Sequence, residues 1–376
     1  MLITKKKLVF LSGTRADFGK LKSLIEVSIS SGLFEVFIFA TGMHLLNEYG
    51  STVREIEKCG YKNIKKFKNC KFEDSMDRIL SNTIRGLSTY INKINPDLII
   101  VHGDRVETLA GAIVGSLNNI LVAHIEGGEV SGTIDELIRH SVSKLSHIHF
   151  VSNEEAKKRL IQMGEIESSI FLIGSPDVDI MISNKLPTLT DAKSKYEIHF
   201  DEYAILMFHP ITTEINLIEQ FSEQLVNAVI KSGKSYVVIF PNNDLGSHLI
   251  LNQYKKLTTN PRFRIFPSIR FEYFLTILKH SKLLVGNSSA GIREAPYYGI
   301  PVVNIGTRQN KRTSHKGIKN CDYNEREILE SISKCYNSKL EPFRSFGNGN
   351  SNKLFIKILT NKSIWEINHQ KQFKDL

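Results

Sequence analysis

The chain has few cysteines and no long hydrophobic run, and each shortage excludes a class of protein. Its 376 residues include four cysteines, Cys59, Cys70, Cys321 and Cys335, with no C-x-x-C spacing. This pattern predicts neither a zinc site nor a disulfide framework, and reduced thiols in the cytoplasm are the default expectation. The first apolar run, Leu8–Leu11, is too short for a signal peptide or a membrane span, so no membrane partner is expected.

The sequence lacks the common phosphate-binding loops, although it has ample positive charge. Neither the P-loop pattern G-x-x-x-x-G-K-S/T nor the dinucleotide pattern G-x-G-x-x-G occurs, which disfavours standard ATPases and dinucleotide enzymes. The net charge of +10 would suit nucleic acid, an anionic membrane or phosphorylated small molecules. Outside a cluster at residues 62–71, the lysines are spread along the chain, which argues against nucleic acid as a partner.

Apolar strand-like runs alternate with helical patterns along the chain. Near-continuous apolar strands are typical of parallel sheets that are buried on both faces. Between two of them, apolar residues from Met76 to Ile94 recur every three or four positions, and Pro96 ends that helix. The alternation predicts a doubly wound α/β fold. The strand-like runs are Leu8–Leu11, Val36–Ala40, Leu98–Val101, Leu121–Ile125, Ile148–Val151, Tyr203–Phe208, Tyr236–Phe240, Leu283–Val285 and Val302–Ile305.

The chain is too long for one compact core and suits two domains. The composition shifts at Met181–Thr190, and a fresh alternation of strands and helices follows. We therefore expect one Rossmann-like domain over residues 1–180 and a second over residues 181–376. Two such domains would turn the carboxyl ends of their strands toward one cleft, where open α/β sheets bind ligands.

Three carboxylates are candidates for proton transfer. Asp104 and Glu126 each follow a buried strand beside a glycine, and Asp135 comes shortly after them. Clustered carboxylates raise one another's pKa, which suits the abstraction and return of a proton. Ordinary ion pairing, or helix capping by Asp135, are the alternatives. These residues and His124 lack a clear ligand spacing, so no metal site is predicted.

The segment from Gly286 to Glu294 is the strongest candidate for binding a diphosphate. An apolar run stops at Gly286, Ser288 and Ser289 follow, and Glu294 lies five positions after Ser289. A glycine allows close approach of a ligand to the backbone, and a helix start favours anions. Glu294 would accept hydrogen bonds from ribose hydroxyls. The alternative is an ordinary serine N-cap on a buried helix.

Cationic residues also follow predicted strands. Arg15, Arg105 and Arg308 come after the loops expected at the cleft, and a planar guanidinium suits a diphosphate. A salt bridge is the alternative for each. His209 opens the second half and could protonate a departing phosphate, whereas the closely spaced His147 and His149 are expected to be packed in a strand.

Together these segments resemble the hydrolysing UDP-N-acetylglucosamine 2-epimerases, which include bacterial enzymes of sialic acid synthesis. The resemblance covers roughly residues 8 to 310 and its combination of segments is specific. The matching segments are GTRADFGKL from Gly13, TGMH from Thr41, HGDRVETLAGA from His102, HIEGGEVSGTIDELIRHSVSKLSHIHFVSNEEA from His124, IGSPDVD from Ile173, FHPITTE from Phe208, FPNND from Phe240 and GNSSAGIREAPYYGIPVVNIGTRQ from Gly286.

The resemblance implies a GT-B-like pair of Rossmann-type domains in which the second holds UDP. It also implies a last helix, around Ile364–Phe373, that packs back on the first domain. The implied acid/base residues are Asp104, Glu126 and Asp135, with Arg139 supporting them and His209 acting on the leaving group. The implied contacts with the UDP-sugar are Arg15, Arg105, Arg139, His209, Asn242, Ile269, Ser288, Ser289, Glu294 and Arg308.

The reaction implied by the resemblance converts UDP-N-acetylglucosamine and water to N-acetylmannosamine and UDP, the first step of sialic acid synthesis. Elimination of UDP to a 2-acetamidoglycal and hydration of that intermediate need no cofactor or metal. A homodimer or homotetramer is implied as well. Three alternatives stay open: the same reaction on UDP-2,4-diacetamido-2,4,6-trideoxyglucose for legionaminic acid, a non-hydrolysing 2-epimerase, and a GT-B glycosyltransferase.

Overall fold

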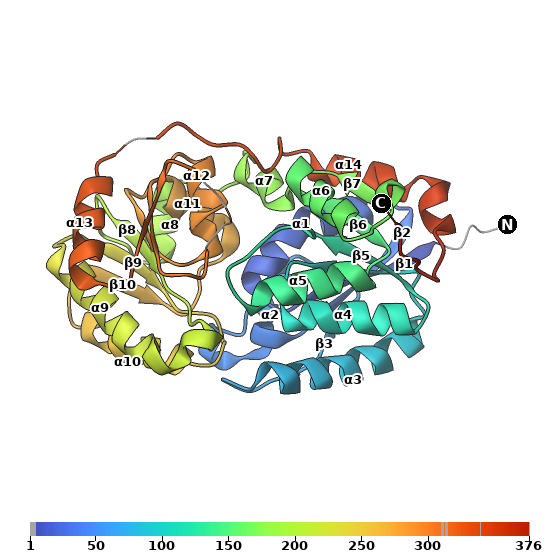
Figure 1. Ribbon diagram of the computed structural model, residues 1–376, viewed down its shortest axis with the longest axis horizontal. Coiled ribbons are helices and arrows are strands. Elements are labelled where there is room, and N and C mark those ends of the chain that lie inside the picture. The colour runs from blue at the N-terminus through green and yellow to red at the C-terminus, as the bar shows by residue number, and fades with distance from the viewer. Residues whose placement is uncertain (1–4, 310–311, 313–314, 339, 376) are drawn as a thin grey trace. The chain divides into compact units, whose positions relative to one another are not determined.

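The computed structural model describes residues 5–309, 312, 315–338 and 340–375, and its strands form two parallel sheets (Figure 1). The first sheet has seven strands, each parallel to its neighbours. Its order is β3 (Ile64–Lys66), β2 (Phe34–Ala40), β1 (Lys6–Ser12), β4 (Leu98–His102), β5 (Leu121–Ile125), β6 (Ile148–Val151) and β7 (Ile170–Leu172).

The second sheet has six strands and is also parallel throughout. Its order is β10 (Phe263–Phe266), β9 (Tyr236–Ile239), β8 (Ala204–Met207), β11 (Leu284–Gly286), β12 (Val302–Ile305) and β13 (Ile318–Cys321). In both sheets the strand order reverses beside the first strand, which is the arrangement of a doubly wound fold. The predicted α/β class with two parallel sheets is therefore confirmed.

Helices connect the strands, as parallel pairing requires. Those that go with the first sheet are α1 (Arg15–Ser30), α2 (Val53–Lys58), α3 (Met76–Ile94), α4 (Val106–Leu117), α5 (Ile134–Leu145), α6 (Glu154–Gln162), α7 (Pro176–Met181) and α14 (Ser351–Leu359). Those that go with the second are α8 (Leu189–Lys195), α9 (Ile218–Lys231), α10 (Ser247–Tyr254), α11 (Phe271–Lys279), α12 (Glu294–Tyr297) and α13 (Glu325–Cys335).

The chain divides into two compact units, and no single boundary in the sequence separates them. The first unit comprises residues 1–129, 135–183 and 345–376, and the second comprises residues 130–134 and 184–344. The short segment Val130–Ile134 therefore belongs to the second unit although it lies far upstream of residue 184. Conversely, the last part of the chain from Ser345 belongs to the first unit.

The core of the first unit explains why the end of the chain is part of it. Inward residues of β1, such as Leu8 and Phe10, join a buried cluster with Leu21 of α1. Phe355 of α14 is fully buried in the same cluster, and its ring lies 4.9 Å from that of Phe150 on β6. Burial of a phenylalanine stabilises a fold by roughly 2–3 kcal/mol, so α14 contributes substantially to this core.

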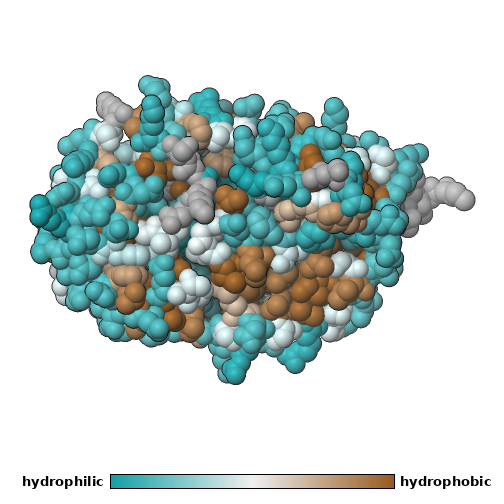
Figure 2. All heavy atoms as spheres, in the orientation of Figure 1, coloured by the Kyte–Doolittle hydropathy of each residue, from teal (hydrophilic) through white to brown (hydrophobic). Residues whose placement is uncertain are grey.

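Apolar side chains are not confined to the core. Figure 2 shows such side chains gathered over α4 and α5 on the viewed face, where Leu117 is 75% exposed and Leu137 is 64% exposed. No helix in the described part of the chain is both long enough and apolar enough to pass through a bilayer.

Candidate functional site

Glu126 occupies the position directly after β5 and is held from two sides. Its side chain is buried, and its backbone has a φ of +64°, a left-handed conformation that is uncommon for a residue with a side chain. His102, the last residue of β4, places Nε2 at 3.1 Å from Oε2 of Glu126. The hydroxyl of Ser175, just before α7, donates to Oε1. The carboxylate is thus fixed in one orientation.

Asp104 and Glu126 are brought together by one arginine. Arg139 on α5 donates through Nη2 to the carboxylate of Asp104 and through Nη1 to the carbonyl oxygen of Glu126, the latter at 2.7 Å. Arg139 is 3% exposed, whereas 23% of the Asp104 side chain is exposed. Arg139 therefore contacts both residues that it was expected to support, and Asp104 is the more accessible of the two carboxylates.

His102 also contacts a carboxylate that sequence reasoning did not select. Its Nδ1 lies 3.3 Å from Oδ1 of Asp17 in the first turn of α1. Burial by itself lowers the pKa of His102, but the charge of Glu126 and the hydrogen bonds to Asp17 and Glu126 outweigh it and raise the pKa to about 9. At neutral pH the imidazole therefore carries a positive charge between two carboxylates.

Three other predicted residues of the first unit lie at helix starts. Asp135 is in the first turn of α5 and is partly buried. Arg15 begins α1, with its guanidinium 4.0 Å from the carboxylate of Glu55. Arg105 precedes α4, with Nε 3.5 Å from Glu107. The salt bridges considered as alternatives for the two arginines are therefore present, at long distances.

Two further buried histidines of this unit are neutral. His124 on β5 lies 2.8 Å from the carbonyl oxygen of Gly103 through Nε2 and 3.1 Å from Ser143 through Nδ1. Burial lowers the pKa of His124 to about 3, and burial likewise lowers the pKa of His44 to about 4. Through its contact with Gly103, His124 supports the loop that carries Asp104.

In the second unit, an asparagine connects the ends of two neighbouring strands. The side chain of Asn287, after β11, accepts from the backbone N–H of His209 at 2.7 Å and donates to its carbonyl oxygen at 2.9 Å. Gly286 makes this approach possible, because a Cβ there would lie 1.9 Å from the carbonyl oxygen of Met207. His209, which follows β8, is thereby fixed beside the Gly286 loop.

The ring of His209 is also oriented. Its Nδ1 accepts a hydrogen bond from the backbone N–H of Asn242 at 3.0 Å, so a neutral ring carries its proton on Nε2. His209 is 5% exposed. The two predicted residues His209 and Asn242 are therefore neighbours, and Nε2 of His209 is the nitrogen that can donate to a ligand.

The helix start expected after the serines consists of two short turns. Ser288 caps a single turn of 3-10 helix at Ser289–Gly291, its hydroxyl accepting from Ala290 N–H at 3.3 Å, and α12 has four residues. A helix this short has little macrodipole to attract an anion. Ser288 is therefore an N-cap residue, as the alternative interpretation proposed, but it caps only a single turn. Glu294 opens α12 and is 4% exposed.

Arg308 returns to the same loop from the end of β12. Its Nη1 donates to the carbonyl oxygen of Asn287 at 3.2 Å, and Nε2 of Gln309 donates to the same oxygen at 2.8 Å. The backbone oxygen of Arg308 accepts from Gly132 N–H at 3.2 Å. Ile269, expected to present its backbone to the base, is buried and lies in the segment that connects β10 to α11.

Sequence reasoning therefore missed several residues that organise the site. His102 and Asn287 stand at strand ends, so the strand-end rule that selected Asp104 could have found them. Nothing in the local sequence signals Ser175, because its partner Glu126 lies 49 positions away. These residues are Asp17, His102, Ser175, Asn287 and Gln309.

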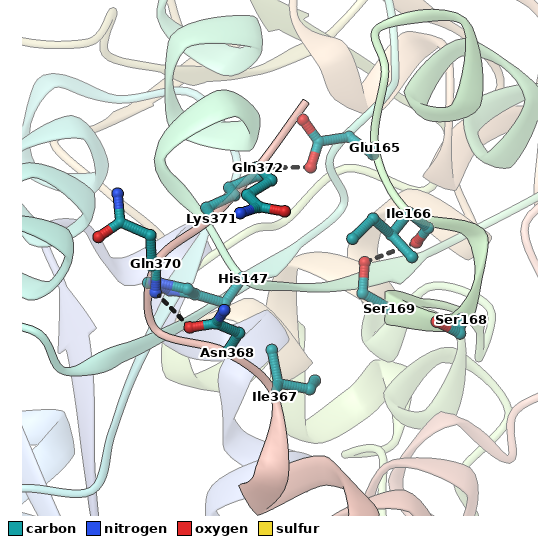
Figure 3. A pocket seen from close by; sticks show the side chains of 10 residues that line it. All are labelled: His147, Glu165, Ile166, Ser168, Ser169, Ile367, Asn368, Gln370, Lys371 and Gln372. Carbon is teal, nitrogen blue, oxygen red and sulfur yellow. Dashed lines mark hydrogen bonds and ion pairs between the residues drawn. The ribbon is translucent and has the colours of Figure 1, made fainter. Parts of the chain in front are cut away.

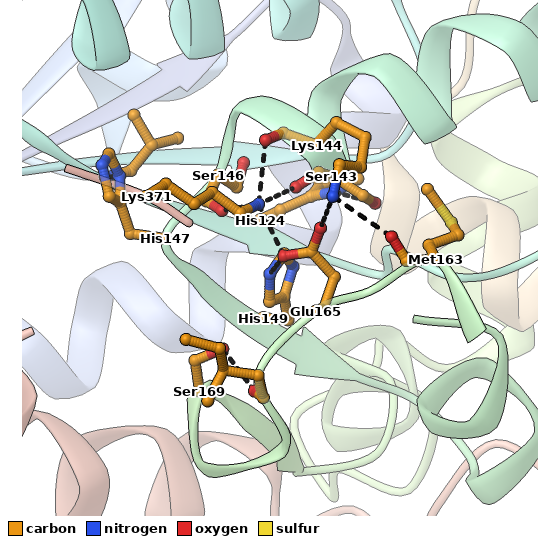
Figure 4. Close-up of polar contacts among 12 residues, drawn as sticks. His124, Ser143, Lys144, Ser146, His147, His149, Met163, Glu165, Ser169 and Lys371 are labelled. Atoms are coloured by element: carbon orange, nitrogen blue, oxygen red, sulfur yellow. Dashed lines mark hydrogen bonds and ion pairs between the residues drawn. The ribbon is translucent and has the colours of Figure 1, made fainter. Parts of the chain in front are cut away.

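A pocket of about 240 Å³ lies elsewhere in the first unit, beneath the last residues of the chain. Its lining includes His147, Glu165 and most residues of the segment 367–372, as Figure 3 shows. Lys371 contacts the carboxylate of Glu165 at 2.5 Å and donates to the carbonyl oxygen of Ser146 at 2.6 Å. It also donates to the carbonyl oxygens of Ser143 and Lys144, so the terminal segment caps the C-terminal end of α5 (Figure 4).

Within the described residues no group of three or more His, Cys, Asp or Glu side chains is arranged to hold a metal ion. His147 and His149, expected to be packed in a strand, are indeed buried on and beside β6. His147 Nδ1 accepts from Val122 N–H at 3.1 Å, and His149 Nε2 lies 2.9 Å from Glu165.

The chain is similar to known proteins over most of its length. A family model described as UDP-N-acetylglucosamine 2-epimerase matches residues 29–360. The chain is 46% identical over 375 residues to the UDP-N-acetylglucosamine 2-epimerase of Neisseria meningitidis, covering 99% of each. It is 33% identical over 361 residues to the hydrolysing UDP-N,N'-diacetylbacillosamine 2-epimerase of Legionella pneumophila, covering 94% of this chain and 95% of that protein.

A solved structure supports the fold independently of close sequence similarity. The crystal structure of UDP-GlcNAc 2-epimerase from Methanocaldococcus jannaschii, in complex with UDP-GlcNAc and UDP, matches with a TM-score of 0.79 and 22% identity. The match covers 94% of this chain and 99% of that one. At this identity the likeness establishes the shared fold.

Proposed function

The chain belongs to the UDP-N-acetylglucosamine 2-epimerase family, and from that membership we propose that it is a hydrolysing enzyme. It converts UDP-N-acetylglucosamine and water to N-acetylmannosamine and UDP, the first step of sialic acid synthesis. The observation that carries this proposal is the cluster in the first unit, where Arg139 joins Asp104 to Glu126. Such a cluster supplies the proton transfers that inversion at C2 requires.

The residues of the second unit act on the leaving group in this scheme. Breaking the C1–O bond sends its electron pair to the diphosphate of UDP. Arg308 and Nε2 of His209 stabilise the charge that develops there, with Ser288 and Ser289 as further donors and Glu294 holding the ribose. Because Asn287 bonds both His209 and Arg308, these cationic and donor groups reach the diphosphate already oriented.

The residues of the first unit act on the sugar. A carboxylate removes the proton at C2, and the electrons of that C–H bond form the double bond of a 2-acetamidoglycal. We assign this step to Asp104, because its side chain is partly exposed whereas both oxygens of Glu126 are engaged by His102 and Ser175. Glu126 and Asp135 then serve the second step, in which water adds to C1 and a proton reaches C2 from the opposite face.

The hydrolysing branch is supported by the segments from Gly13 and His124 and by the 33% identical relative, which is itself hydrolysing. Incubation with UDP-N-acetylglucosamine alone, followed by NMR, tests the proposal. Free UDP with N-acetylmannosamine is the expected result, and UDP-N-acetylmannosamine would instead show a non-hydrolysing enzyme. In heavy water the product is expected to carry deuterium at C2; retained protium would contradict the elimination.

A second candidate substrate is favoured by the same relative, which acts on UDP-N,N'-diacetylbacillosamine. This is the UDP-2,4-diacetamido-2,4,6-trideoxyglucose considered from the sequence. Parallel assays with both UDP-sugars decide between them, since turnover of the diacetamido sugar alone would reassign the substrate. The homodimer or homotetramer and the cytoplasmic location stay predictions, which sedimentation velocity and cell fractionation test.

A further inference from the structure

A charged histidine stands between two carboxylates in the first unit, and the scheme above gives it no task. We propose that His102 is a positioning residue, which holds the carboxylate of Glu126 ionised and in a single orientation for the reaction. This inference rests on the proposed function. It concerns a residue that would act through Glu126 and not on the substrate itself.

The geometry around Glu126 supports this role. His102 bonds Oε2 at 3.1 Å and Ser175 bonds Oε1, so each carboxylate oxygen has a fixed donor. The backbone of Glu126 is anchored as well, because its N–H donates to the carbonyl oxygen of Phe150 at 2.8 Å and its own carbonyl accepts from Arg139. These contacts over-determine a conformation with φ of +64° that would otherwise be strained.

Ser175 is itself held by the returning end of the chain. Its backbone N–H donates to the carbonyl oxygen of Phe346 at 2.7 Å. A Cβ on Gly347 would lie 2.9 Å from the Cα of Gly174, so the backbone segments around these two glycines approach each other closely. The partner of Oε1 is therefore as fixed as the partner of Oε2.

The charge of His102 follows from the groups that face it. Asp17 of α1 lies at 3.3 Å and Glu126 at 3.1 Å. The nearby ring of His124 on β5 adds no positive charge, because burial lowers its pKa to about 3. Burial lowers the pKa of His102, but the two carboxylates raise it to about 9. An imidazolium at this place favours the ionised form of Glu126.

A second histidine–glutamate pair in the same unit provides a matched control. His149 Nε2 lies 2.9 Å from Glu165, and both are buried. Here Lys144 and Lys371 supply the positive charge to Glu165, and burial lowers the pKa of His149 (Figure 4). This pair has the same chemical partners as His102 and Glu126, but its histidine is neutral and it lies outside the candidate site.

The test compares His102→Gln with His149→Gln in the full-length protein. Glutamine keeps a donor near Glu126 but removes the charge, so kcat for His102→Gln is expected to fall about 100-fold while KM changes less than about threefold. Without the imidazolium, the pKa of Glu126 rises, and the acidic limb of kcat against pH should move up by about one unit or more. His149→Gln is expected to leave that limb in place.

A variant that retains His102 covers the case in which His102→Gln does not fold. Asp17→Asn removes one carboxylate, so the pKa of His102 should fall and the alkaline limb of kcat should move to lower pH. Nitrogen chemical shifts of the His102 ring report its charge without any turnover. A neutral ring at pH 7.5, or an unmoved acidic limb in His102→Gln, would overturn the inference. Absence of epimerase activity in the wild type would overturn the proposed function and leave the ring measurement valid.

Discussion

Asn287 and His209 exchange two hydrogen bonds, in which the side chain of the first pairs with the backbone of the second at 2.7 and 2.9 Å. An asparagine side chain presents a donor and an acceptor like a peptide group, so it extends the pairing of β11 and β8 beyond the point where β11 ends. The loop after β8 is consequently fixed to the loop after β11. The proposed diphosphate contacts depend on this pairing.

Replacing Asn287 by aspartate should therefore weaken UDP binding. The variant retains the acceptor for His209 N–H, but it loses the donor and adds a negative charge beside the proposed diphosphate position. We expect the Kd for UDP to rise about 10- to 100-fold, measured by isothermal titration calorimetry. Asn304→Asp is the control, because Asn304 is a buried asparagine of the same unit that bonds only Asn320 among the contacts described. Equal losses in both variants would contradict the assignment.

Two of the buried glutamates, Glu126 and Glu294, should give opposite phenotypes. Glu126→Gln is expected to lower kcat about 100- to 1,000-fold with UDP affinity retained, because the amide cannot accept or return a proton. Glu294→Gln should raise KM and the Kd for UDP about tenfold with a smaller effect on kcat. Steady-state kinetics and calorimetry with UDP separate the two. An exchange of these phenotypes would mean that the division of roles is wrong.

Arg139→Lys should impair turnover although it keeps the charge. A lysine ammonium cannot reproduce the fork that bonds Asp104 and the carbonyl of Glu126 together. We expect kcat to fall about 100-fold with little change in UDP affinity. Arg159→Lys serves as control, since Arg159 on α6 bonds the carbonyl oxygen of Gly128 at 3.2 Å and no carboxylate of the site. Comparable losses of kcat in both variants would contradict the proposal.

The stability of the protein should be greatest near pH 6.5. The pKa of His102 is raised to about 9 in the folded state, so its contribution is complete below pH 6.5 and is lost as the pH rises through 9. That contribution is on the order of 3 kcal/mol. The pKa values of His44 and His124 are lowered to about 4 and 3, so stability also falls as the pH drops below 6.5, where the unfolded histidines bind protons.

Thermal unfolding followed by circular dichroism across pH 4 to 10 measures this dependence. His102→Gln should flatten the alkaline side of the profile and leave the acid side unchanged. His44→Gln should act on the acid side alone. If the alkaline decline persisted in His102→Gln, another group would have to be responsible for it.

The regular parts of the fold were predictable because their signals are local. The apolar repeat predicted α3 with its bounds of Met76 and Ile94, and Asn153 caps α6 through the N–H of Ala156 as its residue type suggests. The sheet edges were missed. Strand β3 has the sequence Ile-Lys-Lys, and its lysines are exposed because only one neighbour pairs with it. Edge strands need no continuous apolar run.

The candidate site was predictable where it depends on strand ends and not where it depends on distant partners. Asp104 and Glu126 could be selected because each follows a buried strand. The left-handed backbone of Glu126 could not be predicted, since it depends on contacts with Ser175 and Phe150 that are distant in the sequence. The loop after β11 was expected to open a helix, and the sequence did not reveal that Arg293, with φ of −110° and ψ of −67°, divides it into two short turns.

The position of Phe355 in the first core constrains how the protein can be made. A ribosome delivers residues in order, and domains generally fold as they emerge. The first unit cannot complete its core until α14 and the segment with Lys371 have left the ribosome, because both pack against residues synthesised much earlier. The second unit, which is encoded in the middle, is the part that can finish during translation. A stop codon before residue 345 would therefore leave the beginning of the protein, and not its end, without a finished core.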